Sequence, residues 1–305
     1  MATVNPESYQ LVSTNYILPL VVIVGPTASG KTTLAIDIAK RFSGEIICAD
    51  SRSIYKGADI GTAKPSISEQ SIVPHWGLDL IEPGEYFSAA DFKTYADSKI
   101  NEIRSRGHIP FLVGGTGLYI DAVLFDYQFG LPVDNKKRQQ LQQMGMTELY
   151  KYCNKNNVIL PENYKNKRYV IRCIENNSKL ATKSAMPQKN SIIVGITTSK
   201  DILRLRITDR IEQFFRDGVI DEAKKLGNNY GWDNESMKSN AYPLIHLYLD
   251  NKMSLDEIKE KLITLDWRLA KRQLTWFRRN KYIHWLSFED AKTYLSDRLA
   301  INKQP

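Results

Sequence analysis

Short apolar runs alternate with amphipathic stretches along the first half of the chain. Each run is bounded by polar residues and rich in Val, Ile and Leu, which predicts a buried strand. The runs are residues 17–24, 45–49, 109–113 and 191–196. Short buried strands separated by helices are typical of a parallel sheet with helices on both faces.

Apolar residues at helical spacing fill the intervals between these runs. Helices are expected over 34–39 and 118–124. A further helix is expected to begin behind Ser88, where Asp91 completes a capping box, and to run to Gly107. Gly, Pro and Ser are frequent between 57 and 83, which predicts loops there. The pattern as a whole predicts an α/β fold.

The second half of the chain has a different character. Residues 128–189 are polar, basic and poor in strands, and they predict a small helical insertion. Beyond 196 the pattern is mostly helical, with a long amphipathic segment from 255 to about 280. We therefore expect an α/β core made of residues 1–127 and 190–305, with a helical C-terminal part, and a separate insertion at 128–189.

Residues 25–32 read Gly-Pro-Thr-Ala-Ser-Gly-Lys-Thr, the G-x-x-x-x-G-K-[ST] pattern of a P-loop between a strand and a helix. Backbone N–H groups of such a loop converge on phosphate oxygens, and the following helix directs its positive end at them. Lys31 adds a positive charge, and the Thr32 hydroxyl can ligate Mg²⁺. The motif predicts a P-loop kinase-like sheet that binds a phosphorylated ligand, without specifying which one.

Polar residues follow two more predicted strands at the same edge of the sheet. Asp50 comes after 45–49 and Thr116 after 109–113, and ligands of open α/β sheets bind at the carboxyl ends of the strands. Beside a P-loop, Asp50 can act as a general base, associate with a metal or cap a helix. Thr116 either binds a phosphate or an acceptor base, or begins a helix. The strand 109–113 lacks the terminal aspartate that P-loop NTPases use to hold their metal.

Basic residues are concentrated in two regions of this 305-residue chain of net charge +8. Residues 134–189 hold twelve basic and four acidic side chains, and 261–282 hold seven and one. Two basic regions beside a phosphate-binding core predict a polyanionic partner larger than a nucleotide. No apolar run approaches the ~20 residues of a membrane span. Three cysteines without disulfide or zinc spacing favour the cytoplasm.

Several longer motifs are distributed over almost the whole chain. The most specific are Ile-Gly-Thr-Ala-Lys-Pro at 60–65 and Ala-Lys-Arg-Gln-Leu-Thr-Trp at 270–276. The full set comprises residues 25–32, 50–51, 54–65, 74–75 with Asp79, 86–92, 113–119 and 270–278. Together these motifs resemble those of the tRNA dimethylallyltransferases, also called tRNA isopentenyltransferases.

The resemblance implies an unusual use of the P-loop, which in this family holds the diphosphate of dimethylallyl diphosphate with the help of Mg²⁺. The exocyclic amine of the adenosine just 3′ of the anticodon in tRNA attacks the allylic carbon, and pyrophosphate departs. Asp50 is then the general base, and Thr116 lies where adenosine and diphosphate meet. The insertion is expected to hold the anticodon stem-loop, and the protein to act as a monomer.

The resemblance also implies a set of binding residues. Those expected to bind diphosphate are Gly25, Thr27, Ala28, Ser29, Gly30, Lys31, Thr32 and Lys238, with Thr32 also the metal ligand. Those expected to bind tRNA are Asp50, Ser51, Arg52, Ser53, Arg168, Arg172, Lys271, Arg272, Gln273 and Arg278.

Five places depart from the family pattern and predict a divergent member. In the insertion, Asn166-Lys167-Arg168 replaces the usual Asn-Asp ahead of an Arg pair. Ser53 stands where a Gln is usual, Lys238 and Trp267 stand where Arg is usual, and Asn240-Ala241-Tyr242 replaces Ile-Gly-Tyr. Two other interpretations stay open: an ATP-binding kinase of a nucleoside or small metabolite, and a catalytically weakened tRNA-binding relative. The basic regions favour a tRNA partner, and the intact Asp50 favours catalysis.

Overall fold

A parallel β-sheet forms the centre of the protein in the computed structural model, which describes residues 18–130, 134–177 and 182–301. Within these residues the sheet has six strands in the order β3-β2-β4-β1-β5-β6, and every neighbouring pair is parallel. The strands are β1 (Leu20–Val24), β2 (Gly44–Cys48), β3 (His75–Trp76), β4 (Ile109–Gly114), β5 (Ser191–Ile196) and β6 (His284–Leu286). The predicted α/β class and parallel sheet are confirmed.

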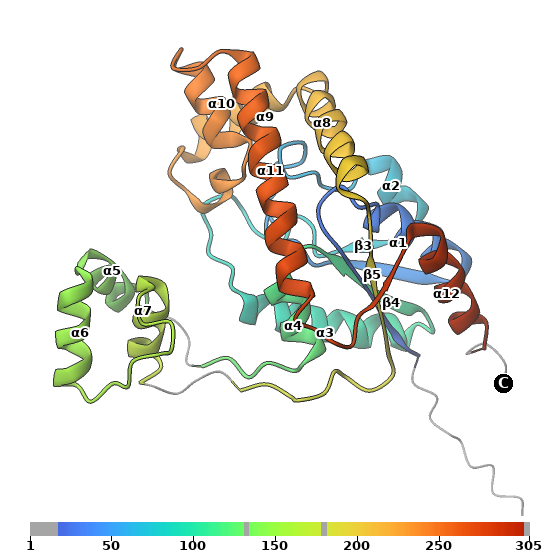
Figure 1. The fold of residues 1–305 in the computed structure, drawn as a ribbon, viewed down its shortest axis with the longest axis horizontal. Helices are drawn as coiled ribbons and strands as arrows, with labels where there is room; N and C mark the ends of the chain where they lie inside the picture. Colours follow the sequence, from blue (N-terminus) through green and yellow to red (C-terminus); the bar gives the residue numbers. More distant parts are fainter. Residues whose placement is uncertain (1–17, 131–133, 178–181, 302–305) are drawn as a thin grey trace, which may run out of the picture.

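Helices cover both faces of the sheet (Figure 1). They are α1 (Lys31–Arg41), α3 (Ala89–Ser105), α4 (Gly117–Leu124) and α12 (Phe288–Ile301). Successive side chains of a strand point to opposite faces. Accordingly, Val22 packs in the cluster with α3 and α4, whereas Val21 packs in the cluster with α1 and α12. Ser88 and Asp91 form the predicted capping box of α3.

A second group of helices packs around its own apolar cluster beside the sheet. It consists of α8 (Lys200–Arg216), α9 (Val219–Tyr230), the short 3₁₀ helix η1 (Glu235–Lys238), α10 (Tyr242–Leu249) and α11 (Leu255–Phe277). The long helix α11 joins both parts of the core, because Leu262 is buried in this cluster and Phe277 in the cluster under α3 and α4. None of the described helices is long and apolar enough to cross a membrane.

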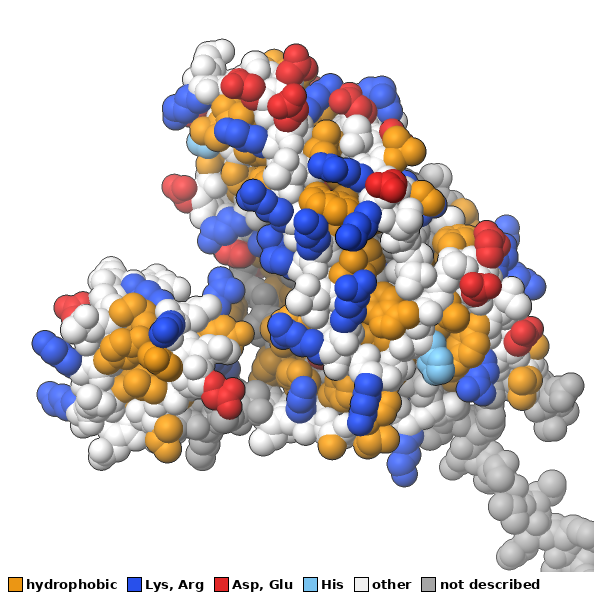
Figure 2. Space-filling view, viewed as in Figure 1, with side chains coloured by type: hydrophobic (Ala, Val, Ile, Leu, Met, Phe, Trp, Pro, Cys, Tyr) orange, Lys and Arg blue, Asp and Glu red, His pale blue; other side chains and the backbone are white. Residues whose placement is uncertain are grey.

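The helices of the insertion lie apart from the sheet (Figure 1). They are α5 (Asn135–Gln143), α6 (Met146–Lys155) and α7 (Lys167–Glu175). Leu149, Cys153 and Val170 belong to a small apolar cluster that α5–α7 share only with one another and the loop after α6. Figure 2 shows them as a lobe beside the core, with Lys and Arg side chains on its surface. The division of the chain into core and insertion at these boundaries stays a prediction.

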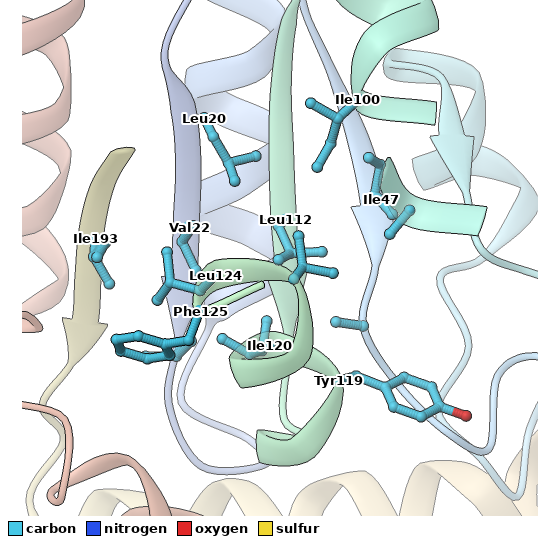
Figure 3. Close-up of a cluster of buried hydrophobic side chains, with 14 of the residues drawn as sticks. Leu20, Val22, Ile47, Ile100, Leu112, Tyr119, Ile120, Leu124, Phe125 and Ile193 are labelled. Carbon is cyan, nitrogen blue, oxygen red and sulfur yellow. The ribbon is translucent and has the colours of Figure 1, made fainter. Parts of the chain in front are cut away.

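The buried face of the sheet under α3 and α4 explains why the strands read as continuous apolar runs. Leu20, Val22, Leu112 and Ile193 point from three neighbouring strands toward Ile120 of α4 and its neighbours (Figure 3). Because the opposite face is covered as well, almost every residue of β1, β2 and β4 is removed from water, and each fully buried Val or Leu contributes about 1.5–3 kcal/mol.

Three short elements were not predicted. The interval 57–83, expected to be loops, contains the six-residue helix α2 (Ile67–Ile72) and the two-residue edge strand β3. The strand β6 occupies three residues at the other edge of the sheet. Such short segments have too few residues to show a period. Pairing with β2 stabilises β3, and pairing with β5 stabilises β6.

Candidate functional site

The predicted convergence of strand ends forms a cavity of about 280 Å³ at the carboxyl edge of the sheet. Its walls come from the P-loop, the loop after β2, the segment around Thr62 and Ala63, and the end of β4. His75, Arg210 and Gln273 complete the lining. The cavity therefore combines groups from six separate parts of the chain around the P-loop.

The P-loop adopts the backbone conformation that its sequence requires. Gly30 caps α1 with a φ of 93°, a left-handed value that favours glycine, and Ala28 also has a positive φ of 61°. The helix begins at Lys31, so its unpaired N–H groups face the cavity. The Lys31 ammonium donates to the Pro26 carbonyl at 2.7 Å, and it lines the cavity.

The surroundings of Lys31 disfavour its protonated form. Burial lowers the pKa of Lys31 to about 8, with the Asp50 carboxylate opposing this shift and the Arg210 guanidinium adding to it. A phosphate group beside the ammonium would supply the negative charge that favours its protonated form. The arrangement is suited to an anionic ligand.

Asp50 and Thr116 lie on adjacent loops, after β2 and β4. Asp50 accepts a hydrogen bond from its neighbour Arg52 N–H at 2.8 Å through one carboxylate oxygen, Oδ1. The Ser51 N–H donates to Thr116 Oγ1 at 3.0 Å, which ties the two loops together. Gly114 makes this close approach possible, because a Cβ there would lie 2.1 Å from the Ala49 carbonyl oxygen. Asp50 lines the cavity, and Thr116 stands behind it.

Arg210 is a cavity residue that the sequence did not reveal. One guanidinium nitrogen donates to the Thr27 hydroxyl at 2.5 Å and another to the Asp266 carboxylate at 2.5 Å. Asp266 is only 5% exposed and also accepts from Asn240 Nδ2 at 2.8 Å. Arg210 sits within the amphipathic helix α8 and belongs to no motif, so only the three-dimensional fold brings it to the P-loop.

Asn240 has a definite partner in this structure. It is one of the departures from the family pattern, and its amide satisfies the second oxygen of the buried Asp266 carboxylate. A buried carboxylate with an unpaired oxygen would be costly. Asn240 therefore supports the charge pair that fixes Arg210 in the cavity.

Gln273 also lies in the cavity. Its side-chain oxygen accepts the Thr27 N–H at 2.7 Å, and its amide nitrogen would lie 2.3 Å from a Cβ at Gly115. The resemblance implied a contact between Gln273 and tRNA, and the structure places this side chain against both the P-loop and the Gly-Gly-Thr-Gly turn.

His75 is a second lining residue that was not among the expected site residues. Its Nδ1 lies 2.9 Å from the Val73 carbonyl oxygen, so Nδ1–H donates and Nε2 is left as an acceptor. Burial lowers the pKa of His75, which keeps the ring neutral. Cys48 lines the same wall, and burial raises the pKa of its thiol to about 12, so the thiol stays protonated.

The remaining expected residues lie in several parts of the structure. Gly25 and Ser29 shape the P-loop from behind the cavity, where Ser29 is fully buried. Lys238 lies on η1 away from the cavity, and its ammonium pairs with Glu235 at 2.7 Å. Arg52 donates to the Glu235 carbonyl oxygen at 2.7 Å. Ser53 is buried in the cavity wall, and Arg168 and Arg172 lie on α7. Lys271 and Arg272 are exposed on α11, and Arg278 is exposed at its C-terminal cap.

Oxygen ligands near the P-loop fit a magnesium ion that is held mainly by a ligand's phosphates. The Thr32 hydroxyl and the Asp50 carboxylate line the same cavity. Mg²⁺ prefers oxygen ligands and usually takes only one or two from the protein. Among the described residues there is no group of three His, Cys, Asp or Glu side chains that could hold a metal by itself.

Comparisons with known proteins agree with this architecture. The model of the family described as IPP transferase matches residues 53–280. The tRNA dimethylallyltransferase of Halalkalibacterium halodurans is 38% identical, covering 89% of this chain and 92% of that protein. The enzyme of the same name from Bacillus subtilis is 37% identical, covering 88% and 90%.

Solved structures give the same result. The tRNA isopentenylpyrophosphate transferase of Bacillus halodurans has a TM-score of 0.71 at 36% identity and covers 93% of this chain and 97% of its own. A related transferase from Staphylococcus epidermidis has a TM-score of 0.69 at 31% identity, with coverages of 94% and 99%. The chain belongs to the tRNA dimethylallyltransferase family.

Proposed function

We propose that this protein transfers a dimethylallyl group from dimethylallyl diphosphate to the exocyclic amine of an adenosine in tRNA, releasing pyrophosphate. One observation supports this most directly. The P-loop, two cationic side chains and the Asp50 carboxylate line one cavity beside the basic helix α11. An anion site alone suits any phosphorylated ligand. The adjacent carboxylate and the basic helix suit an RNA acceptor that must lose a proton.

The amine nitrogen forms a bond to the primary allylic carbon as the bond from that carbon to the diphosphate oxygen breaks. The electron pair of the broken bond leaves with pyrophosphate. The nitrogen then carries an extra proton, and Asp50 accepts it as the general base. Only one of the two carboxylate oxygens is engaged by the protein backbone, which leaves the other to face the amine.

Negative charge accumulates on the departing pyrophosphate. The N–H groups at the start of α1, the Lys31 ammonium and the Arg210 guanidinium, which line the cavity, would stabilise it. Because Asp266 and Thr27 already fix Arg210, this guanidinium needs no rearrangement as the charge develops. Thr32 would hold Mg²⁺ together with the diphosphate, and the bound ion would neutralise part of the leaving-group charge.

The acceptor is the adenosine just 3′ of the anticodon. To reach Asp50 it must leave the stacked anticodon loop, as bases do in other enzymes that modify them. Thr116, tied to the Ser51 backbone, would position the loop on which Asp50 lies. The basic residues of α7 and α11 would hold the anticodon stem-loop by its phosphates. We also propose that the reaction takes place in the cytoplasm and that the protein acts as a monomer.

One incubation tests the function. The protein is mixed with labelled dimethylallyl diphosphate, Mg²⁺ and unmodified tRNA, and a parallel tube contains labelled ATP and a nucleoside. Label on tRNA is the expected result. Phosphate transfer from ATP would assign the chain to the kinases instead, and tight tRNA binding without label would assign it to non-catalytic tRNA-binding relatives.

A further inference from the structure

A groove of about 350 Å³ lies on the outer side of α11, separate from the main cavity. Lys271, Arg272, Thr275, Trp276 and Arg279 line it, and we refer to it as the α11 groove. Trp276 lies three residues, about 4.5 Å along the helix axis, beyond the cavity residue Gln273. Figure 2 shows Lys and Arg side chains along this face of α11, with apolar side chains between them.

The Trp276 ring at the groove is held in a fixed orientation. Its Nε1–H donates to Asp121 Oδ2 at 2.8 Å. Gly117, the first residue of α4, packs so closely that a Cβ there would lie 2.2 Å from Trp276 Cδ1. The partly buried Trp276 also packs against the apolar cluster under α3 and α4. A ligand stacking on this ring would therefore cost little side-chain entropy.

The cations around the ring have no acidic partners. Lys271, Arg272 and Arg279 are exposed, and within the described part of the chain no carboxylate lies at ion-pair distance from any of them. From residue 267 to 288 the sequence has six Lys and Arg and no Asp or Glu. Arg279 instead lies over the Trp276 ring, with Cζ 5.8 Å from the ring centroid.

An aromatic face bordered by unpaired cations is the recognised arrangement for a single-stranded nucleic acid. The base stacks on the ring, and the cations neutralise the backbone phosphates on either side. We propose that the α11 groove binds one nucleotide of the tRNA, with its base stacked on Trp276 and its phosphates held by Lys271, Arg272 and Arg279. This inference rests on the proposed function, because it needs tRNA as the partner.

The position of the groove identifies which nucleotide it takes. The acceptor adenosine would occupy the main cavity, which Gln273 lines, and Trp276 lies three residues further along the same helix. Two sites so close on one helix suit two nucleotides that are near each other in one strand. The base on Trp276 therefore belongs to an immediate neighbour of the acceptor adenosine. Holding that neighbour would keep the acceptor from returning to its stack.

The test uses an RNA hairpin with the anticodon stem-loop sequence and a fluorescent end label, with its affinity measured by anisotropy. Trp276→Leu should weaken binding at least tenfold, whereas Trp276→Phe, which keeps an aromatic face, should weaken it less than threefold. Arg279→Gln should weaken binding and reduce its salt dependence by about one ion. Arg298→Gln removes one exposed arginine that also lies over an aromatic ring, Tyr294, on α12, and should leave binding unchanged.

Hairpins with a single base removed locate the stacked nucleotide. One position beside the acceptor should lose at least tenfold affinity for the wild type and none for Trp276→Leu. Equal losses for both proteins at every position would overturn the proposal, as would wild-type affinity in both Trp276→Leu and Arg279→Gln.

Two further measurements separate this proposal from the proposed function. Label transfer by the wild type without the base-specific loss would refute the groove and leave the function intact. The base-specific loss without label transfer would refute the proposed function and leave the α11 groove proposal intact. A polyglutamate peptide that bound as tightly as the hairpin and lost equal affinity in Trp276→Leu would assign the groove to an acidic peptide and overturn the proposal.

Discussion

The Thr27 backbone N–H donates a hydrogen bond to Gln273 Oε1 at 2.7 Å, which joins the P-loop to α11 across 246 positions of the sequence. The donor site and the helix expected to contact RNA are therefore in direct contact. RNA that displaces Gln273 would also free a P-loop N–H. This contact gives a physical route by which acceptor binding affects the donor site.

Gln273→Glu should raise the KM for dimethylallyl diphosphate at least tenfold. The carboxylate can still accept the Thr27 N–H, but it adds a negative charge to a cavity that binds a diphosphate. Two like charges about 4 Å apart repel by about 4 kcal/mol near a protein surface. Steady-state kinetics with saturating tRNA provide the measurement. An unchanged donor KM would show that the diphosphate lies away from this part of the cavity.

Arg210→Lys should also weaken donor binding at least tenfold. Arg210 contacts Thr27 and Asp266 through two different nitrogens, and a single ammonium cannot reproduce that fork. Arg204→Lys is the matched control, because Arg204 lies on the same helix but is exposed. Calorimetric titration with inorganic pyrophosphate measures the effect. Equal losses in both variants would refute a specific role for Arg210.

Glu222 of α9 fixes the segment that forms one wall of the cavity. Its carboxylate accepts the N–H groups of Asp59, Ile60 and Gly61 at 2.8, 2.8 and 2.9 Å, and the hydroxyl of the buried Tyr242 at 2.8 Å. Glu222→Gln replaces one acceptor oxygen with a donor. We expect it to lower the free energy of unfolding by about 1–3 kcal/mol.

Urea unfolding measures this loss, and donor KM should rise in parallel because Thr62 and Ala63 follow directly in the cavity wall. Asp221→Asn provides the control, since Asp221 is the exposed neighbouring carboxylate. If both variants unfold like the wild type, the four hydrogen bonds contribute little.

Donor binding should weaken as the pH rises through about 8. The pKa of Lys31 is about 8 in the folded protein, against an ordinary lysine pKa of 10.5. Calorimetric titration with pyrophosphate between pH 6.5 and 9.5 gives the pH profile of binding. The profile of Lys31→Met serves as the reference that corrects for the ionisation of pyrophosphate itself. Parallel profiles for the two proteins would contradict the assignment.

The lowered pKa of Lys31 affects stability in the opposite direction: stability rises with pH, whereas donor binding weakens. Because the unfolded chain holds this proton more tightly than the folded one, stability rises with pH between about 8 and 10.5. Below pH 8 the folded protein bears the cost of a buried charge. Lys31→Met should therefore raise the free energy of unfolding at pH 7 by about 1–3 kcal/mol, and the gain should shrink toward pH 10.5.

The elements that the sequence predicted share a local signal. β5 was expected at residues 191–196 and occupies them, because a run buried on both faces is apolar throughout. The P-loop and the capping box of α3 were recognisable because their geometry is encoded within a few adjacent residues.

The parts that were missed depend on contacts between distant segments. Arg210 reaches the P-loop only because α8 packs against α11. On α11 helical spacing in the sequence predicts a mostly apolar stripe of Leu262, Leu265, Leu269, Arg272 and Trp276, of which only Leu262 is fully buried. The buried side is Ile258, Leu262, Asp266, Ala270 and Phe277. A buried aspartate that pairs with Arg210 interrupts the apolar pattern, so periodicity alone pointed to a neighbouring face.

The most direct measurement is transfer of labelled dimethylallyl to tRNA by Asp50→Asn, compared with its affinity for the same tRNA. Asparagine keeps the size of the side chain and the oxygen that accepts the Arg52 N–H, but it cannot take up a proton. The general-base assignment predicts a turnover reduced by about 10²–10⁴-fold with tRNA and donor affinity nearly unchanged. Wild-type turnover in Asp50→Asn, or a collapse of tRNA affinity that accounts for the whole loss, would contradict it.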